Sequence, residues 1–148
     1  MTSKNKKNVF VEGAIDARFI CDSIKKHGSK TNIGAHSIFL GQVRGDLIQG
    51  KTVCAIDYST YTEMAEKEFY KIREFAFSKF DLECLHIYHS LGKVNKGEIN
   101  MFVFTSSKHR KASFDSCIEI VEMIKSNVPI FGKEIFDDGT FVWKENTI

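Results

Sequence analysis

The sequence lacks any apolar run long enough for a membrane-spanning helix, and its first residues, MTSKNKKNVF, contain no apolar signal segment. We therefore expect no membrane association and a cytoplasmic location. A length of 148 residues fits one domain that can bury a sizeable core. Because no internal repeat or low-complexity linker divides the chain, we predict a single domain over residues 1–148, with residues 1–8 as a frayed lead.

Closely spaced cysteines are also absent. The four cysteines, which no CxxC motif joins, are Cys21, Cys54, Cys84 and Cys117. This spacing favours reduced thiols that pack as small apolar residues, and it argues against a zinc site. His86 and His89 fall in the expected strand ECLHIYHSL, where an offset of three residues points side chains to opposite faces. We expect neither a metal ion nor a cofactor.

The chain has little net charge, only +2 at neutral pH. Even in its most basic-looking stretch, Thr105–Glu134, five Lys or Arg residues stand against four Asp or Glu residues. Nucleic-acid binding needs a broader basic surface, so we do not expect it. The sequence also lacks GxGxxG, Walker, GxSxG and HExxH motifs, which excludes the usual signatures of nucleotide-binding proteins, α/β-hydrolases and zinc proteases.

Hydrophobic periodicity predicts about three helices and seven strands. We expect helices from Asp16 to about His27, from a Thr60 capping box to about Phe80, and from Ser106 or Ser107 to just before Pro129. The expected strands are Val9–Ile15, Ala35–Val43 (largely buried), Val53–Ser59, Cys84–Leu91, Glu98–Thr105, Pro129–Phe136 and Thr140–Lys144. Arg44–Lys51 is predicted to be a mobile loop. Because turns alone separate several strands, we predict an α+β fold with substantially antiparallel pairing.

The third helix carries an apolar stripe that ends in a lysine. The stripe consists of Phe114, Cys117, Ile118, Val121 and Ile124. At about 100° per residue, Lys125 returns to within roughly 20° of the direction of Phe114. Either this lysine extends its ammonium to water along the edge of the core, or it is held there for a function.

The first turn of the same helix is crowded with cations. Lys108, His109, Arg110 and Lys111 stand where the helix dipole favours negative charge. A bound anion would relieve this conflict, because side-chain cations and free backbone N–H groups would converge on it. The alternative is an ordinary solvated basic turn.

Three motifs occur in order along the chain: FLGQVR at Phe39–Arg44, SSKHR at Ser106–Arg110, and KSNVPIFGKE at Lys125–Glu134. Together they resemble the large subunit of molybdopterin synthase, the MoaE family of molybdenum-cofactor biosynthesis. The resemblance extends from about residue 9 to residue 146, and the sequence EIFDDG after the third motif adds to it.

The resemblance implies a MoaE-like α/β hammerhead fold and a sulfur transferase. Members of the family convert cyclic pyranopterin monophosphate (precursor Z) to molybdopterin by inserting two dithiolene sulfurs. The sulfur arrives as a thiocarboxylate on the C-terminus of a small ubiquitin-like subunit of the MoaD type. The implied assembly is a heterotetramer around a homodimer of large subunits. Because the phosphate and the thiocarboxylate are both anionic, a site that joins them needs fixed cations.

The resemblance also implies the site residues. Lys125 would be central to the chemistry, and Lys133 would be a second catalytic lysine. The substrate-binding residues would be Gln42, Val43, Arg44, His109, Arg110, Lys125, Gly132, Lys133 and Glu134. Glu134 would orient a neighbouring cation or form an ordinary salt bridge.

The chain departs from the family pattern at several positions. The family commonly reads PIWKKE, whereas this chain reads PIFGKE, so that Gly132 stands where a lysine is expected and Phe131 replaces a tryptophan. Lys133 can replace the missing lysine only if the backbone is turned, because neighbours in an extended segment face opposite ways. Lys108 stands where proline is common. We expect no contribution from the basic C-terminal tail that many members carry, since Ile148 ends the sequence.

Two other functions compete with the synthase hypothesis. A non-catalytic anion-binding or protein-interaction module would keep the scaffold, and Gly132 favours it. The joint retention of Arg44, His109, Arg110 and Lys125 argues against it. A cysteine-based sulfurtransferase would need an activated thiol in an electropositive site. Cys117 falls on the apolar helix face, which disfavours this option.

Overall fold

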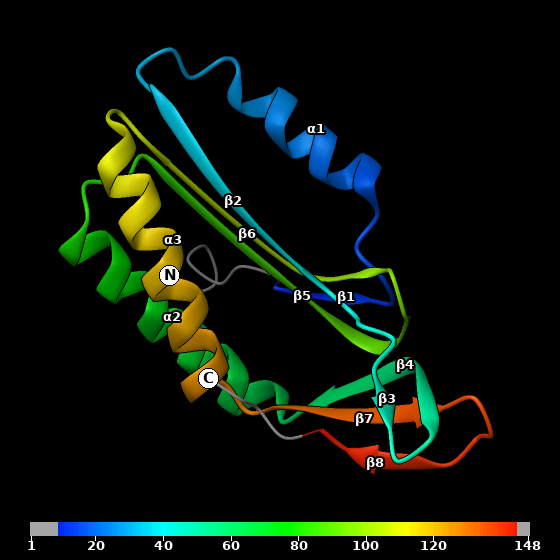
Figure 1. The fold of residues 1–148 in the computed structure, drawn as a ribbon. Coiled ribbons are helices and arrows are strands. Elements are labelled where there is room, and N and C mark those ends of the chain that lie inside the picture. The colour runs from blue at the N-terminus through cyan, green and yellow to red at the C-terminus, as the bar shows by residue number, and fades with distance from the viewer. Residues whose placement is uncertain (1–8, 145–148) are drawn as a thin grey trace.

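A computed structural model describes residues 9–144, in which three helices and eight strands form one α+β unit (Figure 1). The helices are α1 (Ala17–His27), α2 (Thr62–Lys79) and α3 (Arg110–Asn127). The strands are β1 (Phe10–Glu12), β2 (Ala35–Gln42), β3 (Leu47–Ile48), β4 (Lys51–Thr60), β5 (Cys84–Asn95), β6 (Ile99–Ser107), β7 (Ile130–Phe136) and β8 (Phe141–Trp143). The predicted fold class is confirmed. The frayed lead expected at residues 1–8 lies outside the described residues.

The strands form one sheet in the order β2-β6-β5-β4-β7-β8, and β3 pairs with β4. Every pairing is antiparallel except that of β1 with β5. The first part of β5 pairs with β6, and its last part pairs with β4, so β5 joins two halves of the sheet (Figure 1). Gly92 lies where they meet, at φ +82°, and a side chain there would collide with Glu12.

The core lies on both faces of β6. Met101 and Val103 pack into the main hydrophobic cluster with α2 and α3, whereas Phe102 and Phe104 pack with Ile20 of α1. Because successive side chains of a strand point to opposite faces, a strand covered on both faces is a continuous apolar run. The sequence MFVF of β6, Met101–Phe104, has this form. Among residues 9–144, no helix has the length and apolarity required to cross a membrane.

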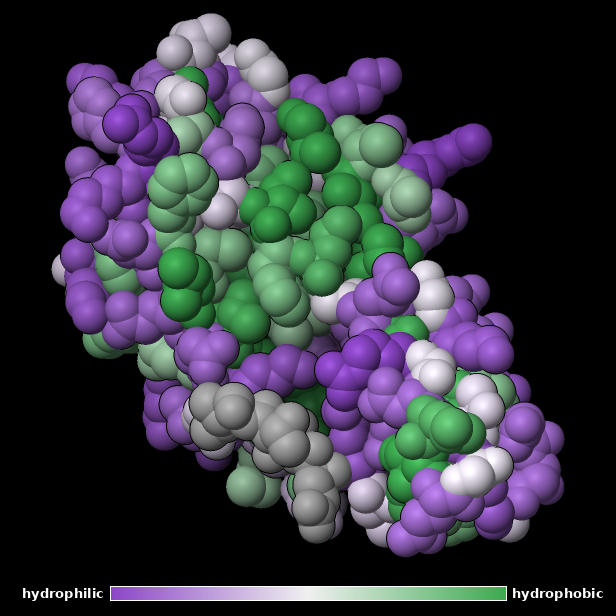
Figure 2. Space-filling view, in the orientation of Figure 1, coloured by the Kyte–Doolittle hydropathy of each residue, from purple (hydrophilic) through white to green (hydrophobic). Residues whose placement is uncertain are grey.

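The prediction that residues 35–43 form a largely buried strand is wrong in its burial. In this chain β2 is an edge strand, and Ile38 and Leu40 are 38% and 42% exposed. Figure 2 shows an apolar area over this strand, between α1 and α3. The exposed large apolar side chains in these elements include Phe19, Ile24, Ile38, Leu40, Phe114 and Ile118. We call these six residues the β2 face.

Both predicted serine or threonine caps are wrong. Helix α3 begins after His109, which makes no side-chain capping bond, while Ser106 and Ser107 end β6 and are fully buried. Helix α2 begins after Tyr61 rather than Thr60. The Thr60 hydroxyl donates instead to the carbonyl of Pro129 at 2.7 Å, because this tertiary partner competes with the local cap.

The predicted apolar stripe of α3 is wrong at two positions, since Phe114 and Ile118 are exposed. The buried face consists of Ser113, Ser116, Cys117, Ile120, Val121 and Ile124. Ser113 and Ser116 can be buried because their hydroxyls donate to the helix carbonyls of Arg110 and Ser113. Small residues with satisfied hydroxyls let the helix approach the sheet, and this displaces the larger apolar residues outward.

The region predicted as a loop at residues 44–51 contains a short hairpin instead. Strand β3 pairs with the start of β4, and Gln49 and Gly50 form the turn with positive φ values of 51° and 78°. Two positive φ values are the signature of a tight type I′ turn, which glycine at its second position favours. The strand expected to end at Leu91 also continues to Asn95.

Candidate functional site

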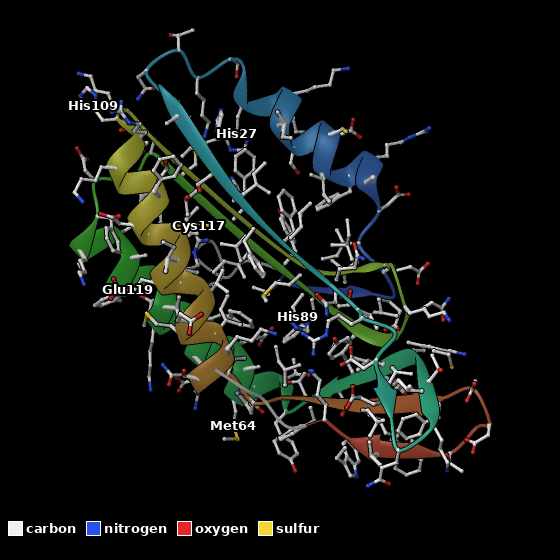
Figure 3. All side chains as sticks on the ribbon, in the orientation of Figure 1. His27, Met64, His89, His109, Cys117 and Glu119 are labelled. Carbon is white, nitrogen blue, oxygen red and sulfur yellow. The ribbon has the colours of Figure 1, made fainter. Side chains whose placement is uncertain are left out.

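A pocket of about 260 Å³ lies where the two halves of the sheet meet the last turn of α3. Its walls come from the end of β2, from β4 to β6, from the start of β7 and from Lys144. Figure 3 shows His89 of β5 in this part of the molecule, at the opposite end of α3 from His109. The pocket gathers Gln42, Arg44, Lys125, Gly132 and Glu134 from the predicted site residues. Val43, His109, Arg110 and Lys133 lie outside it.

Among residues 9–144, three cations border the pocket: Arg44, Lys125 and Lys144. Although the Lys125 residue as a whole is exposed, partial burial of its ammonium is the main cause that lowers the pKa of this lysine. Repulsion from Lys144 and Arg44 lowers the pKa further, whereas Glu122 raises it. The pocket thus concentrates positive charge around a lysine that gives up its proton more readily than a surface lysine.

Arg44 stands at the rim with its side chain 72% exposed. Its Nε and Nη2 both donate to the carboxylate of Asp46, each at 3.1 Å, and this contact raises the pKa of Arg44. The guanidinium fork is thereby held in place beside the opening, where it can bind two oxygens of an anion that displaces Asp46. Its neighbour Val43 points the other way, into a core cluster, and is 1% exposed.

A buried, neutral histidine, His89, lines the pocket. The Nδ1–H of His89 donates to the carbonyl of Ser90 at 2.8 Å, so the neutral ring offers Nε2 as an acceptor. Burial lowers the pKa of His89 to about 4, and the charge of Lys125 acts in the same direction. At neutral pH this ring is therefore uncharged and can accept a hydrogen bond.

Beside His89, Asn100 donates from Nδ2 to the Tyr58 hydroxyl at 2.7 Å, and burial raises the pKa of that tyrosine. The buried Oδ1 of Asn100 has no hydrogen-bond partner among the described residues. Tyr58, His89, Asn100 and Lys144 all line the pocket, and sequence reasoning missed all four. They come from separate elements and share no motif that could have identified them.

Alternation along β7 separates Gly132 from Lys133. Gly132 faces the pocket, where an added Cβ would lie 3.0 Å from Cγ2 of Ile56. Lys133 lies on the other face, with its Nζ 4.6 Å from the ring centre of Phe141 and 5.5 Å from that of Trp143. These cation–π contacts hold the Lys133 ammonium away from the pocket of its own chain.

His109 and Arg110 lie at the beginning of α3, while Lys125 lies near its end. At 1.5 Å per residue, about 23 Å of helix separates them. Figure 3 shows His109 at the far end of the helix. One chain therefore does not bring this basic turn to its own pocket.

Cys117, the cysteine weighed as a nucleophile, is buried between α3 and the sheet. Burial raises the pKa of its thiol, and side-chain hydrogen bonds with Ser37 and Thr105 offset this only in part. A protonated, enclosed thiol is a poor nucleophile, so the geometry disfavours a cysteine-based mechanism at this position.

Comparisons with known proteins agree on one family. The MoaE protein family model matches residues 14–127. The molybdopterin synthase catalytic subunit of Pyrococcus abyssi is 38% identical over 117 residues, which cover 79% of this chain and 78% of that protein. The subunit of the same name from Drosophila grimshawi is 42% identical over 115 residues, which cover 76% of this chain but only 32% of that longer protein.

Solved structures have the same fold. Molybdopterin synthase from Staphylococcus aureus aligns with a TM-score of 0.77 at 27% identity, over 93% of this chain and 96% of that chain. A chain in the complex of subunits 1 and 2 of molybdopterin-converting factor from Helicobacter pylori aligns with a TM-score of 0.79 at 22% identity, over 93% and 90%.

Proposed function

The chain belongs to the MoaE family, and on this premise we propose that it is the catalytic subunit of a molybdopterin synthase. It converts precursor Z to molybdopterin, with both dithiolene sulfurs delivered as the C-terminal thiocarboxylate of a small MoaD-type subunit. It acts in the cytoplasm as a single-domain subunit over residues 1–148. The observation that carries this proposal is the convergence of Arg44, Lys125 and Lys144 on one pocket.

The charge of the pocket suits two anionic reactants. A substrate phosphate and a thiocarboxylate repel each other, and fixed cations between them offset this repulsion without any rearrangement during the reaction. Arg44 offers a planar fork at the rim for phosphate oxygens. Asn100 and His89 offer buried acceptors for the N–H groups of a pterin ring, and the carboxylate of Glu134 lines the same pocket.

Lys125 is the residue that we assign to the sulfur-transfer step. In its ammonium form it holds the thiocarboxylate beside the pterin and stabilises the negative charge that develops on the oxygen of the attacked carbon as the C–S bond forms and the C–O bond breaks. Because burial lowers its pKa, it can also release a proton to a leaving oxygen and recover it from solvent. Glu134, 9% exposed in the same pocket, orients the neighbouring cations.

Lys144 takes the place of the lysine that the family pattern expects at position 132. Its Cβ lies 3.6 Å from the position of a Cβ on Gly132, and its charge acts on Lys125. Lys133 cannot reach the pocket of its own chain without leaving Phe141 and Trp143. We therefore assign the second lysine role to Lys144 rather than to Lys133.

His109 and Arg110 complete the pocket of a second chain. The start of β2 lies beside the start of α3, since Gly34 N–H donates to the Ser107 carbonyl at 2.9 Å, and the ends of both elements meet at the pocket. If two β2 edges meet antiparallel, a two-fold axis brings the basic turn of one chain to the pocket of the other. The exposed β2 face supplies the apolar surface for this homodimer.

A non-catalytic binding module remains the second candidate, and one experiment separates the two functions. The full chain is mixed with a thiocarboxylated small subunit and precursor Z, while complex formation and dithiolene product are measured separately. The synthase proposal predicts both complex and product. A complex that forms without product would support the binding module instead.

A further inference from the structure

A second cluster of reactive side chains lies on the α1 side of the sheet, away from the pocket. It consists of His27 at the end of α1, and Cys84 and His86 at the start of β5. One ligand atom from each residue lies within 4.8 Å of those of the other two. His27 and Cys84 are buried, and His86 is half-buried. Figure 3 shows His27 between α1 and the sheet, distant from His89.

The two histidines face each other through their Nε2 atoms, which are 3.1 Å apart. Around a tetrahedral zinc ion with bonds of 2.0–2.1 Å, two nitrogen ligands lie roughly 3.3 Å apart. The present separation is therefore close to that of a metal-bound pair. As the sequence predicted from their spacing, His86 and His89 lie on opposite faces of β5, so His89 takes no part.

The orientation of His27 is fixed by a backbone carbonyl. Its Nδ1 lies 2.7 Å from the carbonyl oxygen of Ser23, which can only accept a hydrogen bond. Nδ1 therefore carries the proton in the neutral ring, and Nε2 presents a lone pair toward His86. A carbonyl on the far nitrogen is the usual support of a metal-binding histidine.

We propose that His27, Cys84 and His86 bind a zinc-type divalent cation, with water in the fourth position. Two imidazoles and a thiolate favour Zn²⁺ or Co²⁺ over Mg²⁺ and Ca²⁺, which prefer oxygen ligands. Spacing in the sequence conceals this site, because 59 positions separate His27 from His86. The proposal is independent of the synthase function.

Lys30 must move when the metal binds. The Nζ of Lys30 lies 2.9 Å from the Cys84 sulfur. A metal cation bound to that sulfur would therefore be repelled by the positive charge of Lys30. Lys30 is exposed, so its long side chain can swing into solvent. On binding, the thiol proton of Cys84 passes to the buffer and the sulfur coordinates as thiolate. The Nε2 proton of His86, which donates to His27 in the free protein, moves to its Nδ1 through solvent, so that both Nε2 atoms coordinate with lone pairs. The metal then ties the end of α1 to β5.

The test is a Co²⁺ titration of the reduced, tag-free full chain, followed by visible and near-ultraviolet absorption. We expect one Co²⁺ per chain, with d–d bands of a tetrahedral site and a sulfur-to-cobalt charge-transfer band, both removed by one equivalent of Zn²⁺. Cys84→Ser should abolish the charge-transfer band, and His86→Asn should weaken binding at least about tenfold. Cys21→Ser, at an exposed cysteine of α1, is the matched control and should change nothing.

Two further measurements keep the test decisive if Cys84→Ser folds poorly. Zn²⁺ should raise the melting temperature of wild type but not of His86→Asn, because only a bound ligand stabilises the folded state. Lys30→Ala should bind Co²⁺ at least as tightly as wild type. The proposal is overturned if wild type gives no charge-transfer band, or if the band survives in folded Cys84→Ser; the cluster is then only a hydrogen-bonded histidine pair.

Discussion

Lys144 lies directly beside Gly132, and its backbone N–H donates to the Gly132 carbonyl at 2.7 Å. Because Gly132 has no side chain, the space on this wall of the pocket is open to Lys144. The adjacent Lys133 contacts the rings of Phe141 and Trp143 on the other face of β7. The family pattern expects a lysine at position 132 of β7. In this chain, Lys144, which follows β8, can supply that positive charge instead.

Replacement of Lys144 should therefore impair the reaction more than replacement of Lys133. We expect Lys144→Ala to lower the rate of dithiolene formation by roughly 10²-fold, the usual loss for one group that stabilises developing charge. Lys133→Ala, the matched control on β7, should stay within a few-fold of wild type. The measurement is the rate of dithiolene formation by each variant in the reconstituted reaction. A larger loss for Lys133→Ala than for Lys144→Ala would show that Lys133 is the second lysine.

Acid should destabilise the protein through His89. The pKa of this histidine is about 4 in the fold, against 6.5 ordinarily. As the pH falls below 6.5, His89 becomes protonated in the unfolded chain but stays neutral in the folded chain. The contribution of His89 to the free energy of unfolding is therefore fully present above pH 6.5 and is lost as the pH falls toward 4. Urea unfolding at several pH values should show a smaller loss for His89→Asn than for wild type. An unchanged slope in His89→Asn would contradict this account.

The shared site predicts complementation between two inactive chains. Arg110→Ala and Lys125→Ala should each form inactive homodimers. A mixed dimer should regain activity, because the pocket with an intact Lys125 receives Arg110 from the Lys125→Ala chain. If both residues served the pocket of their own chain, neither pocket of the mixed dimer would be complete. Absence of activity in mixed dimers, verified by differential tags, would therefore rule out the shared pocket.

The β2 face should control self-association. Leu40→Asp places a charge on an exposed apolar side chain at the edge strand, and we expect sedimentation velocity to show a shift from dimer to monomer. Met64→Asp, at a methionine of α2 that is 58% exposed, is the control and should remain dimeric. If Leu40→Asp remains dimeric, the β2 face is not the dimer interface.

Sequence patterns predicted the elements well where burial dominates. The continuous apolar run of β6 and the helical spacing of Ala65, Phe69, Ile72 and Ala76 on the inner face of α2 both match the observed burial. Patterns failed where tertiary contacts compete with local ones. Thr60 bonds to Pro129 rather than capping its helix, and Ile38 is exposed because its strand is an edge.

The sequence predicted only those pocket residues that belong to one of the three motifs. Gln42, Arg44 and Lys125 were expected in the pocket and lie there, because each belongs to a contiguous motif. Tyr58 and Lys144 reach the pocket through strand pairing, which no local pattern encodes. The metal-ligand cluster on the α1 side was missed for the same reason.

The central claim is that Lys125 performs the sulfur-transfer chemistry in this pocket. The most direct test is single-turnover formation of dithiolene by Lys125→Ala, with the thiocarboxylated small subunit bound to saturation. Lys79→Ala, an exposed lysine paired with Glu119, is the control. We predict a loss of roughly 10²- to 10³-fold for Lys125→Ala and none for the control. A wild-type rate in Lys125→Ala at equal small-subunit occupancy would contradict the assignment.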